Sequence, residues 1–90
     1  MLKTLENIIK LARERKKIPV EGSYTNELLT NRSLSKAKVL EEIDELIEAT
    51  EEDTNKIHEA ADVFYHLLVY LEANEIKIED VMLELEKRKK

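Results

Sequence analysis

Carboxylates recur at helical spacing in two segments of the chain, in an arrangement typical of a metal site. Glu42 and Glu45 are three residues apart, as are Glu59 and Asp62, and thirteen residues separate the two pairs. Residues three apart on a helix lie on one side, one turn from each other, so each pair can act as a pincer. Ligands that are all oxygen favour a hard cation such as Mg²⁺ or Mn²⁺. The spacing predicts two pincers that face each other, with Glu41 beside them.

These acids could instead form an ordinary solvated surface, because 20 of the 90 residues are acidic. Two observations argue against that interpretation. Like charges one helical turn apart repel by ~0.2–0.5 kcal/mol when nothing compensates them. Glu59 and Asp62 also lie among apolar residues, including Phe64 and Leu67. We therefore expect these two carboxylates to be buried, and a buried carboxylate needs a partner.

Histidines and tyrosines accompany the second acidic pair. His66 lies four residues after Asp62, on the same side of a helix, and could contact a substrate or serve as a structural hydrogen-bond partner. His58 is expected at the surface without a function. Tyr65 and Tyr70 are expected in the core or at an interface, not in catalysis.

The only glycine and the only proline of the chain lie in one predicted loop, residues 18–25. Gly22 precedes Ser23, Tyr24 and Thr25. Such a loop can bring backbone amides and hydroxyls close to phosphate oxygens, because glycine has no side chain to block the approach. The loop directly follows a basic segment that includes Arg13.

Helices must position these groups, because the chain consists mainly of residues that favour helix and shows no β-alternation. We predict a single all-α domain over residues 1–90 with four helices, at about 2–17, from Ser33 or Ser35 to 52, 54–73 and 78–89. Ser33 or Ser35 would cap the second helix. Residues 26–29 form at most a short turn of helix. The short connection at 53–55 predicts an antiparallel second and third helix.

The third predicted helix is apolar on nearly all faces, which indicates burial on more than one side. Four short helices cannot cover it within one chain, and there are no cysteines for a disulfide or a thiolate zinc site. We therefore expect a homodimer with this helix near the interface.

Composition excludes several classes of function. A net charge of -5 with mixed signs does not suit a nucleic-acid-binding protein. No apolar run is long enough to cross a membrane. The first seventeen residues lack the uninterrupted apolar core of a secretory signal. We expect a cytoplasmic protein.

The acidic pattern resembles the signature of the all-α nucleotide pyrophosphohydrolases, the MazG-type superfamily. Within this superfamily, two segments resemble the phosphoribosyl-ATP pyrophosphohydrolases of histidine biosynthesis. They are the loop PVEGSYT at 19–25 and the segment EAADVFYHLLV at 59–69. The resemblance extends over residues 13–88. It implies a four-helix protomer that packs into a bundle across an obligate dimer, whose active site draws on both subunits. It further implies Mg²⁺-dependent hydrolysis of phosphoribosyl-ATP to phosphoribosyl-AMP and pyrophosphate.

The resemblance also implies roles for individual residues. The metal ligands would be Glu42, Glu45, Glu59 and Asp62. Glu41 would be a further ligand or would orient the attacking water. Substrate contacts would come from Lys38, which would bind phosphate, from His66, and from the loop region with Arg13, Gly22, Ser23, Tyr24 and Thr25.

The chain departs from the family pattern near these residues. Leu40 replaces a glycine before the paired glutamates, Ala37 replaces the first lysine of a K-K-V-G-E-E segment, and Arg32-Ser33 lies where another glycine is expected. These changes affect the substrate pocket more than the metal ligands. Two alternatives therefore stay open: a housekeeping nucleoside-triphosphate pyrophosphatase of the same superfamily, and a non-catalytic helical dimerisation module.

Overall fold

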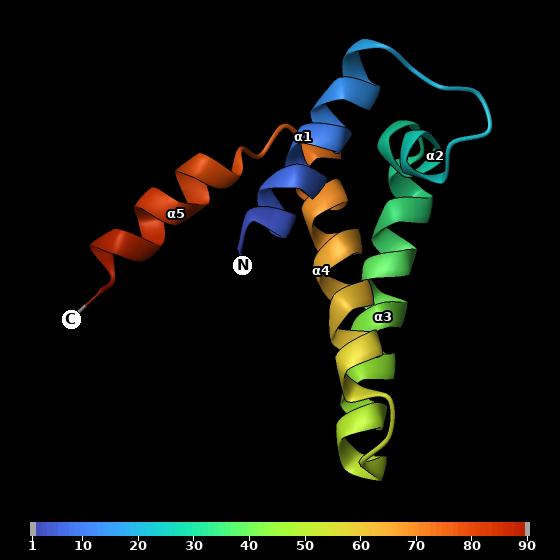
Figure 1. Cartoon of the computed structure of the whole chain (residues 1–90), viewed down its shortest axis with the longest axis vertical. Coiled ribbons are helices and arrows are strands. Elements are labelled where there is room, and N and C mark those ends of the chain that lie inside the picture. Colours follow the sequence, from blue (N-terminus) through green and yellow to red (C-terminus); the bar gives the residue numbers. More distant parts are fainter. Residues whose placement is uncertain (1, 90) are drawn as a thin grey trace.

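The computed structural model describes residues 2–89, which form five α-helices and no strand (Figure 1). The helices are α1 (Lys3–Lys17), α2 (Tyr24–Thr30), α3 (Arg32–Glu52), α4 (Lys56–Ala73) and α5 (Ile78–Lys87). The predicted all-α class is confirmed, and the four long helices lie within a few residues of their predicted bounds. The predicted number of helices is wrong, because the segment expected to make one turn forms the seven-residue helix α2.

Tertiary contacts explain α2, since seven residues do not form a stable helix alone. The Ser23 side chain accepts a hydrogen bond from the backbone N–H of Asn26 and so caps the first turn. Thr25, Asn26 and Leu28 are buried against neighbouring elements. The predicted loop therefore ends at Ser23, and Tyr24 and Thr25 belong to a helix.

A single residue joins α2 to α3. Asn31 follows the last residue of α2, and its side-chain oxygen accepts a hydrogen bond from the N–H of Leu34 at 3.1 Å, which caps α3. The predicted cap was wrong, because Ser33 and Ser35 both lie inside the helix. Asparagine caps as well as serine does, and Asn31 comes first in the chain.

The helices α3 and α4 form an antiparallel pair, as predicted, and lie side by side along most of their length (Figure 1). Only residues 53–55 connect them. Asp53 and Asn55 adopt the left-handed conformation, with φ of 56° and 46°. Asp and Asn tolerate this conformation better than other residues with a side chain, so they suit a tight connection.

The core lies where α1 and α2 pack against α4. Its buried apolar residues come mostly from these three helices: Ile9, Ala12, Leu28, Leu68, Val69 and Ala73. The half of the α3–α4 pair nearer its connection has no such cover (Figure 1). Side chains in that half therefore keep more contact with solvent, except where the two helices face each other.

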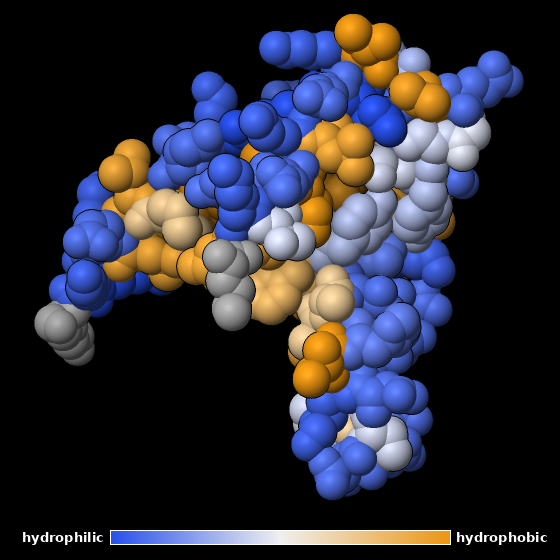
Figure 2. Space-filling model, in the orientation of Figure 1, coloured by the Kyte–Doolittle hydropathy of each residue, from blue (hydrophilic) through white to orange (hydrophobic). Residues whose placement is uncertain are grey.

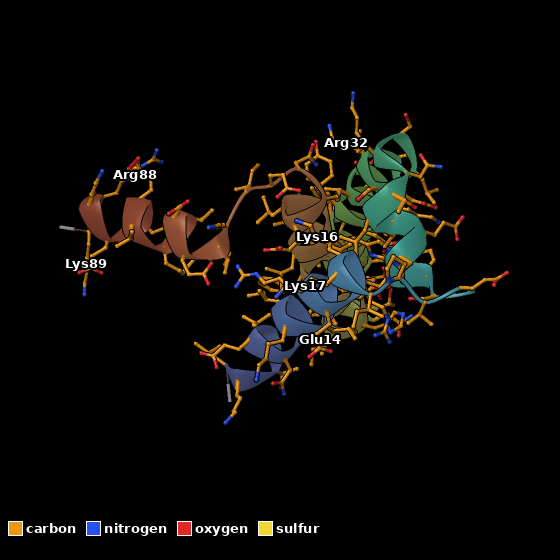
Figure 3. All side chains as sticks on the ribbon, turned by 90° about the horizontal axis from the view of Figure 1, so that it is seen from above. Glu14, Lys16, Lys17, Arg32, Arg88 and Lys89 are labelled. Atoms are coloured by element: carbon orange, nitrogen blue, oxygen red, sulfur yellow. The ribbon has the colours of Figure 1, made fainter. Side chains whose placement is uncertain are left out.

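Charged side chains attach α1 to the end of α4 and to α5. The Arg13 guanidinium binds the buried carboxylate of Glu72 at 3.2 Å. It also binds the exposed carboxylate of Glu79, in the first turn of α5, at 2.6 Å. Lys16 donates to the Glu72 carbonyl at 2.8 Å and pairs with Glu75. Figure 3 shows Lys16 over this end of α4. This network holds the start of α5 in place.

Apolar side chains remain exposed on three helices. No residue of α5 is buried, and the helix points away from the others (Figure 1). The largest exposed apolar side chains of α3, α4 and α5 are Leu40, Ile43, Ile47, Ile57, Phe64, Met82, Leu83 and Leu85. Figure 2 shows such residues along α5 and over the middle of the molecule. The exposed apolar surface that was expected on α4 is therefore divided among α3, α4 and α5. Among the described residues, no helix has the length and hydrophobicity that crossing a membrane requires.

Candidate metal centre and active site

Carboxylates from α3 and α4 converge where the two helices face each other. Glu42, Glu45 and Glu59 each offer an oxygen, and these oxygens lie within 4.8 Å of one another. Asp62, one turn further along α4, forms a second group of the same size with Glu59 and His58. The structure therefore brings the two predicted pincers together, with Glu59 common to both groups.

Glu42 is the buried member of this cluster, with only 8% of its surface exposed. Its Oε2 atom has no hydrogen-bond partner within residues 2–89, and the same holds for Oε2 of Glu59. Burial, with the nearby carboxylates of Glu45 and Asp62, raises the pKa of Glu42. Burial and the charge of Glu45 likewise raise the pKa of Glu59. Buried carboxylate oxygens without donors call for positive charge, so this cluster fits a divalent cation.

The expectation that Glu59 and Asp62 would be buried was only half right, since both are half-buried and Glu42 is the buried acid. The reason is local. Glu42 lies in the middle of α3, whereas Glu59 lies in the first turn of α4, in the half of the pair that no third helix covers (Figure 1). Glu41 is exposed and pairs with Lys38 at 3.1 Å, outside the converging group. That hydrogen bond raises the pKa of Lys38.

His66 is buried on α4 and makes two hydrogen bonds. Its Nδ1 lies 2.8 Å from the carbonyl oxygen of Asp62, and its Nε2 lies 3.0 Å from the hydroxyl of Tyr24. A carbonyl oxygen only accepts, so Nδ1 carries a proton and donates it to Asp62, while Nε2 shares a hydrogen bond with the Tyr24 hydroxyl. Burial raises the pKa of Tyr24, and the charge of Lys38 opposes this. The predicted contacts Tyr24, His66 and Lys38 thus lie near one another and near Glu42.

The other predicted loop residues have structural partners. The Ser23 hydroxyl caps α2, and the buried Thr25 hydroxyl lies 2.6 Å from that of Tyr65. Gly22 adopts a φ of +83°, which favours glycine. An open hollow of about 530 Å³ borders the loop and α2, lined by residues 19–23, Asn26, Glu27 and Thr30.

Arg13 is a predicted site residue whose ion-pair partners lie outside the acidic cluster. Both of its partners, Glu72 and Glu79, are carboxylates at the other end of α4 or beyond. Glu72 is ten residues after Asp62, which corresponds to about 15 Å along a helix. Arg13 therefore binds α5 and α4 in this structure, while its predicted contact with substrate stays a prediction.

Sequence reasoning did not name two acids that lie near the cluster. Glu48 and Glu52 line a pocket of about 310 Å³ with Glu45 and Glu59, next to the α3–α4 connection. The continued spacing of three or four residues along α3 was an available signal. His58, expected to be without function, is exposed as predicted, but its Nε2 lies 3.4 Å from a carboxylate oxygen of Asp62.

Comparison with known proteins places this arrangement in a family. Residues 2–89 match the family model described as phosphoribosyl-ATP pyrophosphohydrolase. The chain is 44% identical to the phosphoribosyl-ATP pyrophosphatase of Clostridium acetobutylicum, over 98% of this chain and 80% of that protein. It is 46% identical to the histidine biosynthesis bifunctional protein HisIE of Pyrococcus furiosus and 42% identical to the chloroplastic one of Arabidopsis thaliana. The matches cover 100% and 97% of this chain but only 42% and 33% of those two longer proteins. The chain belongs to the phosphoribosyl-ATP pyrophosphohydrolase family.

Proposed function

We propose that this chain hydrolyses phosphoribosyl-ATP to phosphoribosyl-AMP and pyrophosphate, the second step of histidine biosynthesis. One observation carries the proposal: in a chain of this family, oxygens of Glu42, Glu45 and Glu59 converge within 4.8 Å, and Glu42 and Glu59 each have a buried carboxylate oxygen with no hydrogen-bond partner among the described residues. The names of the relatives give the same activity or the same pathway. Such a cluster suits a reaction on a polyanion, whose charge must be neutralised before water can attack phosphorus.

The four acids fit a divalent cation, and we propose Mg²⁺, with Mn²⁺ as an alternative. Glu42, Glu45, Glu59 and Asp62 would hold it, and when bound it would neutralise phosphate charge and favour deprotonation of the attacking water. Glu41 lies next in the chain to Glu42 and is exposed, so it would orient that water or serve as a further ligand.

Residues along α2, α3 and α4 would bind the substrate. Within residues 2–89 the ion-pair partner of Lys38 is the exposed Glu41, so a phosphate could replace that partner. Tyr24 is 42% exposed and holds His66, which places a phenol and an imidazole beside the acids. Gly22 leaves the backbone of the loop open to a phosphate oxygen.

We further propose that the enzyme is a homodimer with its active site near the interface. Leu40 and Ile43 flank Glu41 and Glu42 and are exposed, as is Phe64 on α4, two residues after Asp62. A second copy of the chain that covers these side chains would also border the acids. As an enzyme of amino-acid biosynthesis that acts on a nucleotide, it is expected in the cytoplasm.

Product analysis tests the reaction. The protein is incubated with Mg²⁺ and phosphoribosyl-ATP, ATP or a deoxynucleotide triphosphate, and the products are separated by anion-exchange chromatography. We expect pyrophosphate and phosphoribosyl-AMP from the first substrate, at a rate orders of magnitude above the other two. Hydrolysis in ¹⁸O-labelled water would show which phosphorus is attacked. A faster reaction with the deoxynucleotide would instead support the housekeeping alternative.

Two matched variants test the acids. Glu45→Gln and Asp62→Asn keep the shape of each side chain and remove one charge, so we expect loss of activity with unchanged helical circular dichroism. Excess chelator should have the same effect on the wild type. Full activity of either variant would refute the assignment of the metal ligands. If neither the wild-type protein nor the variants bound Mn²⁺ in a calorimetric titration, the non-catalytic dimerisation module would be the better interpretation.

A further inference from the structure

Two hydrogen bonds join the first turn of α2 to α4 beside the acidic cluster. The Thr25 hydroxyl lies 2.6 Å from the Tyr65 hydroxyl, and the Tyr24 hydroxyl lies 3.0 Å from Nε2 of His66. Consecutive residues of α2 thus bind consecutive residues of α4. The rings also pack together: Tyr24 stacks on Tyr65 with centroids 6.4 Å apart, and Tyr65 meets His66 edge to face at 5.0 Å.

The two contacts face different surroundings. Thr25 is 7% exposed, so its hydroxyl is turned inward and is already bound to Tyr65. Tyr24 is 42% exposed and lies close enough to Lys38 and Glu42 for their charges to act on its pKa. Thr25 is therefore suited to hold α2, whereas Tyr24 is suited to meet a ligand.

The position of α2 depends on such contacts. A seven-residue helix has little stability of its own. A loop, residues 18–23, precedes it, and Asn26 ties the first turn to α1 by donating from Nδ2 to the Arg15 carbonyl at 3.1 Å. The Thr25–Tyr65 bond ties the same turn to α4 next to Tyr24, so its loss would loosen the contact of Tyr24 with α4.

We propose that Tyr65 is a positioning residue for substrate binding: its hydroxyl holds Thr25, and this places the neighbouring Tyr24 on His66, near Lys38 and Glu42. The proposal rests on the proposed function for its effect on catalysis. Under this proposal Tyr65 acts through Thr25 and Tyr24 and not by contact with the substrate, since its hydroxyl is bonded to Thr25 and not to an acid of the cluster. Loss of its hydroxyl therefore weakens substrate binding and leaves the chemical step and the cation site intact.

Tyr65→Phe and Thr25→Val test this with minimal changes of shape, together with the double variant. Tyr70→Phe is the matched control, because Tyr70 is on the same helix but takes no part in these contacts. One hydrogen bond of ordinary strength corresponds to roughly a 3- to 10-fold change in affinity. We expect KM to rise by about that factor in each single variant and no further in the double variant, with kcat within about twofold. Cation affinity by calorimetry should not change.

Amide hydrogen exchange gives a readout that needs no substrate. Tyr65→Phe should speed exchange in α2 severalfold while exchange in the middle of α3 stays at its wild-type rate. The proposal is overturned if α2 exchange is unchanged, if the KM effects of the two substitutions multiply, or if kcat falls while KM stays the same. Inactivity of the wild type toward phosphoribosyl-ATP would refute the proposed function, and the exchange measurement would still decide the role of Tyr65.

Discussion

Replacing Glu42 with glutamine should stabilise the protein without a cation and destabilise it with one. The change keeps the shape of the side chain and removes one charge from a cluster whose oxygens lie within 4.8 Å of each other. For the Glu42–Glu45 pair at that separation, Coulomb's law gives about 0.9 kcal/mol in water and about 3.5 kcal/mol at an effective dielectric constant of about 20. Glu45 is exposed, so we expect a gain near the lower end, about 1 kcal/mol. For a chain of this size that raises Tm by about 4–8 °C.

Protonation sets the pH at which this gain appears. Because the pKa of Glu42 is raised by burial, its ionisation costs stability as the pH rises through that pKa. The glutamine variant has no such loss, so its advantage grows as the pH rises through the raised pKa of Glu42 and is complete above it.

Mg²⁺ should reverse the order of the two proteins. A ligand that binds only the folded state stabilises it by about 2.7 kcal/mol when the ligand concentration is 100 times its Kd. For this chain that corresponds to a rise in Tm of roughly 10–20 °C. The variant lacks one proposed ligand and should gain much less. The Tm values of the two proteins therefore cross as Mg²⁺ is added.

Thermal unfolding followed by circular dichroism, in excess chelator and in saturating Mg²⁺, measures both effects. Glu6→Gln on α1 is the control, since Glu6 is exposed and outside the cluster, and it should shift both Tm values equally. Two results would refute the reasoning. A lower Tm for Glu42→Gln in chelator would mean that the protein already satisfies this carboxylate. An equal gain from Mg²⁺ in both proteins would mean that Glu42 is not a ligand.

Three further predictions concern assembly, α5 and the loop. Light scattering at micromolar concentration should return about twice the chain mass of 10.5 kDa, and a value near that mass would contradict the dimer. The Arg13 guanidinium lowers the pKa of Glu79 from 4.5 to about 2, so the pair stabilises the protein above pH 4.5 and loses its effect as the pH falls through 2. Glu79→Gln should thus lower Tm at neutral pH only, and a difference persisting in strong acid would count against this. Replacing Ser23, Tyr24 and Thr25 together with alanine should weaken turnover of phosphoribosyl-ATP far more than Mg²⁺ binding, whereas equal losses would contradict it.

The long helices and the acidic pincers were predictable from the sequence because both depend on local spacing. Helix α4, for example, follows from apolar residues that recur every three or four positions, and this spacing also turns Glu59 and Asp62 to one side. The short helix α2 was not predictable, because its stability comes from contacts with α4 that are forty residues away in the chain. The capping residue Asn31 was missed because two serines nearby were equally good candidates.

Burial and pairing at the site were harder to predict than its composition. Spacing placed Glu42 with Glu45 but could not show that Glu42 alone would be covered, since that depends on where α4 and His66 lie. The family resemblance assigns Arg13 to the substrate-binding loop region, and this role stays a prediction. Its carboxylate partners come from residues 72 and 79, and no local pattern reveals a contact over that distance.

The junction at Asn31 limits where the chain can change in length. Because one residue both ends α2 and caps α3, nothing there can absorb an insertion. An added residue would turn α2 by about 100° relative to its present register and carry Tyr24 and Thr25 away from α4. The exposed loop on the other side of α2 carries no such constraint. Natural variation in length, and any engineered tag or insertion, should therefore be tolerated around residues 19–21 and rejected beside Asn31.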